Sequence, residues 1–430
     1  MGAWADNTVF WHVYPLGFCG APLHPQHNDD NAAPRLHRLT NWLDYATTLG
    51  VNGLLLAPIF AAQSHGYDSI DQFRIDPRLG TEQDFMELVT QAKARDLHIV
   101  LDGVFSHVGS DHPWLQEALA TGPDGPHGDL FDIDWGADGE AKPHVWEGHN
   151  SLARLNHASE SAVDYVYQVM TYWLARGVSG WRLDAAYSVA PAFWDRVLPR
   201  VQEQFPDAFF LGEVIHGDYP RFVAETGVDT VTQYELWKAV WSSLADTNLW
   251  ELDAALTRHN GYLNTFIPQT FIGNHDVTRI ASQVGPEKAI AALAILLTIG
   301  GIPSIYYGDE QGFTAVKGTG FAADDALRPE FPEFPPESYF SSEFFQSYRE
   351  LIYLRRSRPW LSSATSTKIA LTNPRYTYRI TAPDNSDSLE VTIDLDANNS
   401  YDPNKPGTAS GLAVTIRDST GNTIWEYQRR

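Results

Sequence analysis

Residues 160–214 read ESAVDYVYQVMTYWLARGVSGWRLDAAYSVAPAFWDRVLPRVQEQFPDAFFLGEV, and this stretch alternates between two hydrophobic patterns. In 160–177, and again in 190–205, apolar side chains recur at the three- and four-residue spacing of an amphipathic helix. The short segments 178–186 and 207–214 are almost continuously apolar, which is typical of strands buried on both faces. The stretch therefore predicts helix, strand, helix and strand, the repeating unit of a parallel sheet covered by helices.

The same alternation extends in both directions along the chain. Helices are predicted at 34–50, before Gly50 as a C-terminal stop, and at 81–96 with Thr81 as the N-cap. Eight strands with helices between them favour a closed (β/α)8 barrel (TIM barrel) over an open sheet. The predicted strands are 8–18, 51–60, 97–105, 178–186, 207–214, 228–236, 264–276 and 302–309.

Two regions depart from the alternation. An irregular stretch rich in Gly, Asp, His and Trp follows the third strand, and from about residue 360 apolar and polar residues alternate as in antiparallel strands. We therefore predict an α/β barrel from 1–107 and 159–358, a small inserted subdomain at 108–158, and a C-terminal antiparallel β-sandwich domain at 359–430.

The composition limits the classes of partner. The 430 residues include 54 acidic and 30 basic side chains, a formal net charge of -24, which disfavours nucleic acids and anionic membrane surfaces. The start of the chain lacks a basic segment followed by an apolar run, so we expect a cytoplasmic protein, although a secreted protein after signal removal would look the same. The single cysteine, Cys19, excludes an internal disulfide and is expected to be an inert core residue.

Polar residues gather at the ends of the predicted strands. In barrels of this kind the active site lies at the carboxyl ends of the strands, so polar side chains there favour a functional interpretation. They are Asp102 at the end of strand three and His107 after it, Arg182 and Asp184 on strand four, Glu213 on strand five, and His275 and Asp276 on strand seven.

The strand-four pair predicts a nucleophile. Strand side chains alternate between faces, so Arg182 and Asp184 project from the same side. A guanidinium beside a carboxylate should keep it ionised and oriented, as a nucleophile must be. The alternative is a buried structural ion pair.

The strand-five carboxyl predicts a general acid. Glu213 follows an apolar run, and a carboxyl beside apolar surface tends to stay protonated, although a solvated loop residue is the alternative. A protonated carboxyl facing the ionised Asp184 is the arrangement that cleaves glycosidic bonds with retention of configuration. Asp276, next to His275, adds a third carboxylate that could orient sugar hydroxyls.

Together, these residues and the blocks around them resemble those of glycoside hydrolase family 13, the α-amylase family, over most of residues 8–360. The family's signature blocks are matched in order and at compatible spacing, which makes coincidence a poor explanation. The matching blocks are HGYDSIDQFRIDPRLGT (65–81), DGVFSH (102–107), GWRLDAAY (180–187), GEV (212–214), NHD (274–276) and YYGDEQG (306–312).

The resemblance implies a role for each residue and an oligosaccharide as the substrate. Asp184 would form a covalent glycosyl intermediate, Glu213 would be the acid and then the base, and Asp276 would help to distort the sugar. Asp71 would support the Tyr67 loop. The implied substrate-binding residues are Tyr67, which would stack on the sugar, Asp102, His107, Arg182 and His275; without the family, core packing would explain Tyr67 better.

The chain also departs from the family pattern. Members with a structural calcium ion carry an asparagine where this chain has Ser106, and often a Lys-His pair where it has Ala186 and Tyr187. We therefore expect no calcium site and no cofactor. Trp135 and Trp146 in the inserted stretch are candidates for lining sugar subsites, although most tryptophans are expected in the core.

The sequence does not decide which α-glucan is cleaved, nor which molecule accepts the glycosyl group. The block FFLGEVIHGD (209–218) is similar to that of the cyclomaltodextrinase and neopullulanase group, which favours short or cyclic α-glucans. The alternatives are a transglycosylase, isomerase or phosphorylase with the same intermediate, and a non-catalytic carbohydrate-binding protein. The sequence decides neither exo nor endo action, and it leaves the oligomeric state open.

Overall fold

The computed structural model describes residues 2, 4–25, 32–136, 140–320, 322–402, 405 and 408–429. Eight parallel strands form one sheet in the order β13-β12-β11-β5-β2-β1-β15-β14. A parallel bridge between Thr232 and Gln269 joins the two ends, so the sheet closes into the predicted barrel. The strands are β1 Phe10–Val13, β2 Gly53–Leu56, β5 His98–Gly103, β11 Gly180–Leu183, β12 Phe209–Gly212, β13 Thr230–Val231, β14 Gln269–Phe271 and β15 Ile302–Tyr306.

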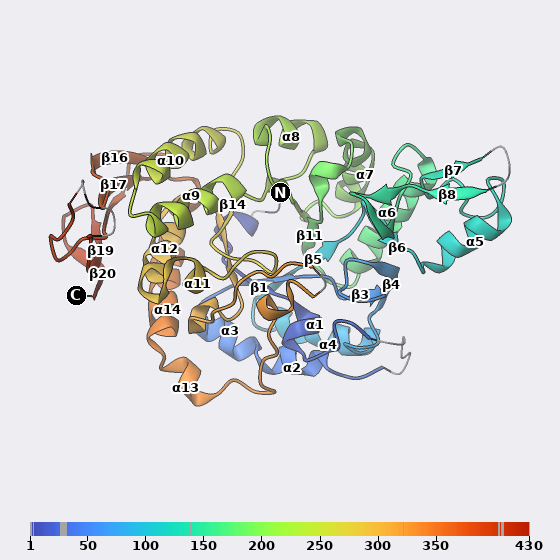
Figure 1. The fold of residues 1–430 in the computed structure, drawn as a ribbon, viewed down its shortest axis with the longest axis horizontal. Coiled ribbons are helices and arrows are strands. Elements are labelled where there is room, and N and C mark those ends of the chain that lie inside the picture. The colour runs from blue at the N-terminus through green and yellow to red at the C-terminus, as the bar shows by residue number, and fades with distance from the viewer. Residues whose placement is uncertain are drawn as a thin grey trace.

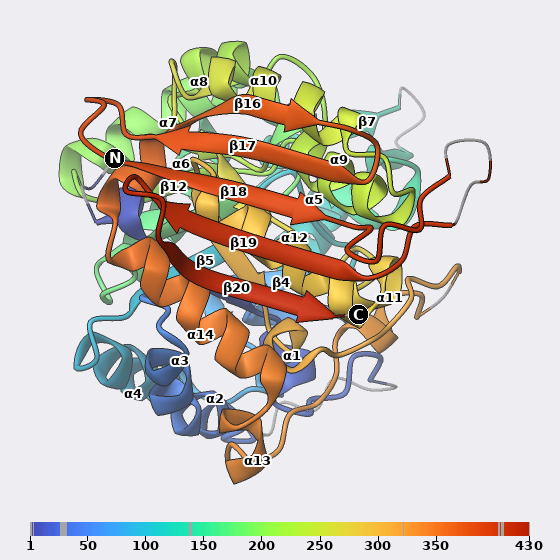
Figure 2. The ribbon, with the colours of Figure 1, turned by 90° about the vertical axis from the view of Figure 1, so that its left-hand side faces the viewer.

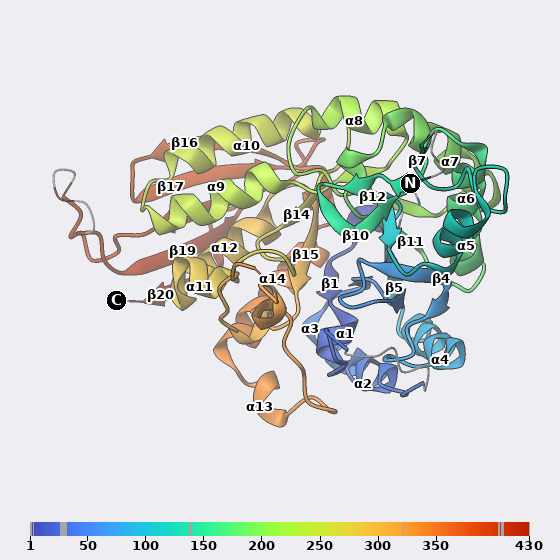
Figure 3. The same cartoon turned by 45° about the vertical axis from the view of Figure 1, so that its right-hand side comes forward.

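Helices surround this barrel (Figures 1 and 3). The predicted N-cap is confirmed, because Thr81 and Asp84 form a reciprocal capping box at the start of α4. The predicted helix at 34–50 is instead two helices that meet at Trp42, and it ends at Gly50, whose φ of 103° lies in the left-handed region. The helices are α1 Pro15–Phe18, α2 Leu36–Asn41, α3 Leu43–Leu49, α4 Glu82–Lys93, α6 Glu160–Leu174, α7 Pro191–Gln204, α8 Tyr219–Thr226, α9 Tyr234–Ala245, α10 Trp250–Tyr262, α11 Ile280–Val284, α12 Pro286–Thr298, α13 Glu337–Phe340 and α14 Glu343–Arg356.

The strands bury both faces, as their apolar runs predict. Phe10, Leu55, Val100, Leu211 and Ile302 belong to a small cluster contributed by five barrel strands, while the side chains that alternate with them join the large core beneath the helices. The small cluster is apolar. Two residues further towards the carboxyl end, the inward-facing side chains are polar, namely Asp102 on β5 and Arg182 on β11. This change places charged side chains at the carboxyl ends of the strands.

The inserted segment lies on one side of the barrel (Figure 1). Its strand β10 pairs antiparallel with β6 and with β9, and β7 pairs with β8. A second excursion, the β3–β4 hairpin, follows β2. The bounds are β3 Phe60–Ala62, β4 Ser69–Ile75, β6 His107–Gly109, α5 Pro113–Thr121, β7 Ile133–Trp135, β8 Ala141–Pro143, β9 Val145–Trp146 and β10 His149–Arg154.

The C-terminal strands form one antiparallel sheet on the opposite side of the barrel (Figures 1 and 2). In the part of the chain that the structure describes, this is a single five-stranded meander, which differs from the predicted sandwich. Its apolar face packs on α10 and α12, so the barrel helices take the place of a second sheet. The strands are β16 Thr365–Leu371, β17 Arg375–Thr381, β18 Ser388–Asp394, β19 Leu412–Asp418 and β20 Thr423–Arg429. None of the described helices is long and apolar enough to cross a membrane.

Candidate active site

A buried arginine holds three carboxylates together at neighbouring strand ends. Arg182 Nη1 donates to Asp102 Oδ1 and Oδ2 at 2.8 and 2.7 Å and to Asp184 Oδ1 at 2.8 Å. Its Nη2 lies 2.7 Å from Glu213 Oε1. Parallel pairing of β5, β11 and β12 puts these residues side by side, with Arg182 opposite Asp102 in the register. The expected juxtaposition of Arg182 and Asp184 is found, and Asp102 and Glu213 share the same guanidinium.

The charge balance of this cluster differs from the expectation for Asp184. Burial raises the pKa of Asp184 well above its usual value; Arg182 acts against this rise, and Glu213 and Asp102 add to it. Burial also raises the pKa of Asp102. Arg182 thus lowers the proton affinity of Asp184 as expected, but one guanidinium serves three carboxylates and does not offset the effect of burial, so the net pKa of Asp184 is raised. Three buried carboxylates around one guanidinium favour a state in which one of the carboxylates is protonated.

Glu213 has polar rather than apolar surroundings. Tyr234 donates its hydroxyl to Glu213 Oε1 at 3.1 Å, and the Ala185 N–H donates to Oε2 at 2.9 Å. Asn274 Nδ2 in turn donates to the Tyr234 hydroxyl at 3.0 Å. Ala185 presents its N–H because its backbone is left-handed, with a φ of 44°, a conformation that costs free energy for a residue with a Cβ. The Glu213 carboxyl is thus held in one orientation beside Asp184.

Tyr67 connects the arginine cluster to His275. The Tyr67 hydroxyl donates to Asp102 Oδ2 at 3.1 Å and hydrogen-bonds His275 Nε2. The two rings also stack, with centroids 5.3 Å apart and an angle of 8° between their planes. His12 packs edge-on against His275, and burial lowers the pKa of His12 well below its usual value, so this neighbour is neutral. The aromatic cluster therefore positions His275 without adding a charge.

Asp276 is the most accessible carboxylate of the site. Its side chain is 34% exposed, and it accepts from Arg328 Nη2 at 3.0 Å and lies 3.1 Å from His275 Nε2. Burial alone would raise the pKa of Asp276, but His275 and Arg328 hold it below the usual value. Arg328 is itself fixed by Asp324 and by its stacking on Tyr14, 4.5 Å from the ring centre. Asp276 is thus an ionised carboxylate held at the open side of the cluster.

His107 belongs to the same network through the backbone of Tyr67. Its Nε2 lies 3.0 Å from Tyr67 O, and its Nδ1 lies 2.8 Å from Ser106 Oγ. Burial lowers the pKa of His107 to about 4, so the ring is neutral at neutral pH. Trp146 of β9 packs against His107 with ring centroids 4.8 Å apart, so this tryptophan reaches the site.

The structure thus brings all eight predicted site residues into one network, whereas two other candidates lie outside it. Asp71 accepts a hydrogen bond from the Phe73 N–H and is not bonded to Tyr67 in the part of the chain described. Trp135 lies on β7 and has no described contact with the cluster. Arg328 and Tyr234 complete the site but were not predicted. Tyr234 could have been found from its position, because it lies near the end of the predicted strand 228–236. Arg328 lies in an irregular segment, and no feature of the sequence pattern points to it.

Ser106 stands at the position where calcium-binding members of the family carry an asparagine. The Ser106 hydroxyl pairs with His107 and offers no amide oxygen to a cation. Within the described ranges, no three His, Cys, Asp or Glu side chains lie together as a metal site would require. The absence of a calcium site stays a prediction from Ser106, Ala186 and Tyr187.

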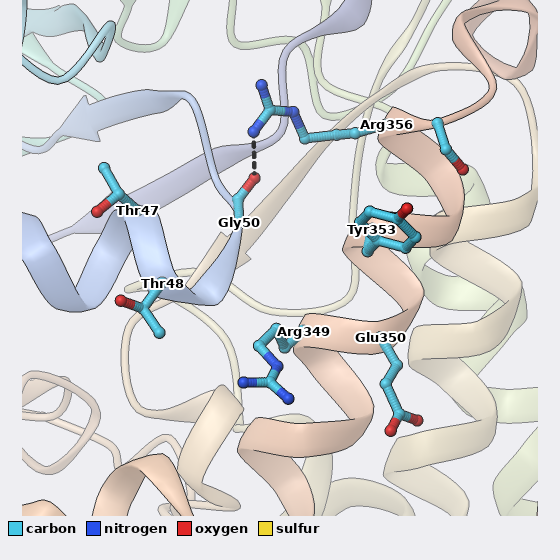
Figure 4. Close-up of a pocket in the computed structure, with 8 residues that line it drawn as sticks. Thr47, Thr48, Gly50, Arg349, Glu350, Tyr353 and Arg356 are labelled. Atoms are coloured by element: carbon cyan, nitrogen blue, oxygen red, sulfur yellow. Dashed lines mark hydrogen bonds between the residues drawn. The ribbon is translucent and has the colours of Figure 1, made fainter.

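A pocket lies near the amino ends of the barrel strands (Figure 4). It has a volume of about 720 Å³ and lies between the end of α3 and α14, where Arg356 donates to Gly50 O at 2.9 Å. Gly50 precedes β2, so this groove lies at the amino ends of the strands. Its lining contains Arg349 and Tyr353 but no carboxylate pair, and barrel active sites lie at the opposite end. The groove is therefore not the candidate active site.

Comparison with known proteins agrees with the fold and identifies the family. Residues 26–331 match the family model described as "Alpha amylase, catalytic domain". Maltogenic alpha-amylase from Bacillus acidopullulyticus is 28% identical over 84% of the chain, and neopullulanase 2 from Thermoactinomyces vulgaris is 30% identical over 82%. The chain spans only 64% and 63% of the length of these two relatives.

A solved structure supports the fold over the whole chain. Ligand-free cyclic alpha-maltosyl-(1-->6)-maltose hydrolase from Arthrobacter globiformis aligns over 100% of both chains with a TM-score of 0.78 and 22% identity. The shared architecture is a (β/α)8 barrel with a C-terminal antiparallel sheet, and in this protein it carries carboxylates at the carboxyl ends of the strands. The chain belongs to the α-amylase family, glycoside hydrolase family 13.

Proposed function

We propose that the protein is a retaining glycoside hydrolase that cleaves α-glucosidic bonds of short or cyclic α-glucans. The observation that carries this proposal is the placement of Asp184 and Glu213 on the two terminal nitrogens of one arginine, with Asp276 nearby. Membership of the α-amylase family supports the reaction class. The relatives named maltogenic alpha-amylase and neopullulanase 2 support α-glucans as the substrate class. Such sugars are uncharged, so the acidic chain does not repel them.

In the first step, an Asp184 oxygen attacks the anomeric carbon while Glu213 gives its proton to the glycosidic oxygen. The bond from the anomeric carbon to that oxygen breaks, and a glycosyl ester to Asp184 forms. The reaction needs one proton on Glu213 and none on Asp184. A buried cluster that keeps a proton among its carboxylates can supply this state, and Arg182 stabilises Asp184 as an anion once the proton is on its neighbour.

In the second step, the Glu213 carboxylate takes a proton from a water molecule. The water oxygen attacks the anomeric carbon and displaces Asp184, so two inversions give net retention. Ala185 and Tyr234 orient Glu213 through both steps. The ionised Asp276 stabilises the positive charge that develops on the sugar in each transition state, and Tyr67 and His275 form the wall against which that sugar packs.

Proton NMR of the reaction tests this proposal. The protein is incubated with maltotriose, cyclic α-glucans, isomaltose, sucrose and trehalose in parallel, and the first product is followed before mutarotation. We expect an α-anomer from at least one α-glucan and no cleavage by Asp184→Ala. A β-anomer as the first product would contradict retention, and no cleavage of any sugar would contradict the proposed activity.

A further inference from the structure

A smaller pocket lies outside the active site, between β4, the start of α5 and α6 (Figures 1 and 3). Its volume is about 220 Å³, and its polar and aromatic lining consists of Asp71, Phe73, His112, Trp114 and Tyr165. Sites for drug-sized ligands are typically about 300 Å³ or larger, so this pocket has room for one small ring. Within the described chain, none of these residues takes part in the active-site network.

The Tyr165 hydroxyl is buried in the wall of this pocket. Tyr165 is only 5% exposed, and its ring lies edge-on to those of Phe73 and Trp114, with centroids 5.9 and 5.5 Å apart. Its hydroxyl makes no hydrogen bond to any described residue. Buried hydroxyls are nearly always paired, because an unpaired one costs free energy. An unpaired hydroxyl in a pocket wall therefore indicates a ligand that supplies the hydrogen bond.

Two further side chains give the pocket a donor and an acceptor. His112 is only 3% exposed, and burial lowers its pKa to about 4, so the ring is neutral at neutral pH. Its Nδ1 accepts from the Trp114 N–H at 3.2 Å, which places the ring proton on Nε2 as a donor. Asp71 Oδ1 accepts from the Phe73 N–H at 2.9 Å, and its Oδ2 is a further acceptor. The lining can thus both donate and accept.

Trp114 supplies an apolar wall. Its indole is half-buried and stacks on His127, with ring centroids 4.3 Å apart and an angle of 4° between the planes. The stack holds the indole in one orientation, so little side-chain entropy is lost when a ligand packs against it. An aromatic ring held in this way suits the C–H face of a sugar.

We propose that this pocket is a second carbohydrate site, which binds a single pyranose unit apart from the active site. Sugar hydroxyls donate and accept, so they can pair with His112, Asp71 and Tyr165 together. An ammonium ion would donate to Asp71 but would leave the His112 N–H without an acceptor. The pyranose ring places its C–H face on Trp114. Binding here does not depend on bond cleavage, and only the choice of a glucoside as the probe follows from the proposed function.

Fluorine-19 NMR of the protein labelled with 5-fluorotryptophan tests the site. The Trp114 signal is identified by its loss in Trp114→Phe. Methyl α-D-glucopyranoside is titrated into the Asp184→Ala protein, so that the probe is not consumed. We expect the Trp114 signal to shift and to saturate with a dissociation constant of about 1 to 10 mM, the range for a ligand of this size.

Two substitutions each change one hydrogen-bonding group of the pocket. Tyr165→Phe removes the hydroxyl, and Asp71→Asn exchanges the Oδ2 acceptor for a donor; each should raise the dissociation constant about fivefold. Tyr165→Phe should not lower the melting temperature, because the hydroxyl has no described partner to lose. Tyr348→Phe is the matched control, because Tyr348 on α14 is also buried and its hydroxyl also lacks a described partner, but it does not line the pocket. Its dissociation constant should equal that of the unsubstituted protein.

The absence of a saturable shift of the Trp114 signal would overturn the inference, as would equal affinity in Tyr165→Phe, Asp71→Asn and the unsubstituted protein. A shift with tetramethylammonium but not with the glucoside would also overturn it, because the pocket would then bind a cation. The proposed function is tested separately. Cleavage of α-glucans by a wild-type protein that shows no Trp114 shift would remove only this site, whereas saturable binding without cleavage would remove only the proposed function.

Discussion

Replacing Asp184 by asparagine should make the protein more stable at neutral pH. Asp184 is only 9% exposed, and burial, Glu213 and Asp102 raise its pKa. A carboxyl whose pKa is higher in the folded than in the unfolded state stabilises the fold at low pH and loses that contribution as the pH rises through the folded value. The Asp184→Asn variant has no carboxyl to ionise at this position, so it does not lose stability in this way as the pH rises. The amide oxygen of the asparagine can still accept the hydrogen bond from Arg182.

The expected gain follows from the size of the chain. The substitution removes one buried negative charge, while Arg182 stays paired with the other carboxylates. We expect this to raise the free energy of unfolding by about 2 kcal/mol. Unfolding entropy of roughly 2.1 cal/mol/K per residue amounts to about 0.9 kcal/mol/K for a chain of this length. The Asp184→Asn variant should therefore melt about 2 °C higher than the wild type at about pH 8.

Thermal melting between about pH 8 and pH 4 checks both the sign and the pH dependence. The difference between variant and wild type should shrink towards acid, where Asp184 itself is protonated. Asp76→Asn is the control, because buried Asp76 pairs bidentately with Arg78 at 2.8 and 2.7 Å, and its loss should lower the melting temperature. An Asp184→Asn protein that melts at or below the wild-type temperature at pH 8 would refute the reasoning.

Three further predictions concern the groups around the carboxylates. Arg328→Met removes a cation that holds down the pKa of Asp276, so the Asp276 carboxyl should titrate at higher pH in the variant, as followed by carbon-13 NMR of the free protein; an unchanged titration would count against this role. Tyr234→Phe removes a donor to Glu213 and should lower kcat about tenfold with little change in KM, whereas a rise in KM alone would indicate binding instead. EDTA should change neither activity nor melting temperature, because Ser106, Ala186 and Tyr187 stand where calcium-binding members carry other residues. A fall in either quantity would reveal a required metal.

The barrel could be predicted because its strands are short and apolar on both faces, and the carboxylates could be placed because strand ends converge. The sequence spacing of Arg182 and Asp184 was enough to put both side chains on the same face of β11. The limits of the elements were harder to predict. β13 is only two residues long because Gln233 caps α9, which begins within the predicted strand.

The environment of each carboxylate could not be predicted from its neighbours in sequence. The residues before Glu213 are apolar, yet its contacts come from Arg182, Ala185 and Tyr234 on adjacent segments. Arg328 meets Asp276 from a segment without hydrophobic periodicity, so nothing in the sequence pattern marked it. Burial and the two neighbouring carboxylates outweigh the effect of Arg182 on the pKa of Asp184, and the number of carboxylates on one guanidinium depends on tertiary structure.

The most direct test of the account is to trap the covalent intermediate and identify the residue that carries it. The protein is incubated with 5-fluoro-α-glucosyl fluoride, which slows release of the intermediate, and is then digested and analysed by mass spectrometry. We expect one glycosyl group on the peptide that contains Asp184. A glycosyl group on another residue, or none on a protein that the reagent inactivates, would contradict the assignment of Asp184 as the nucleophile.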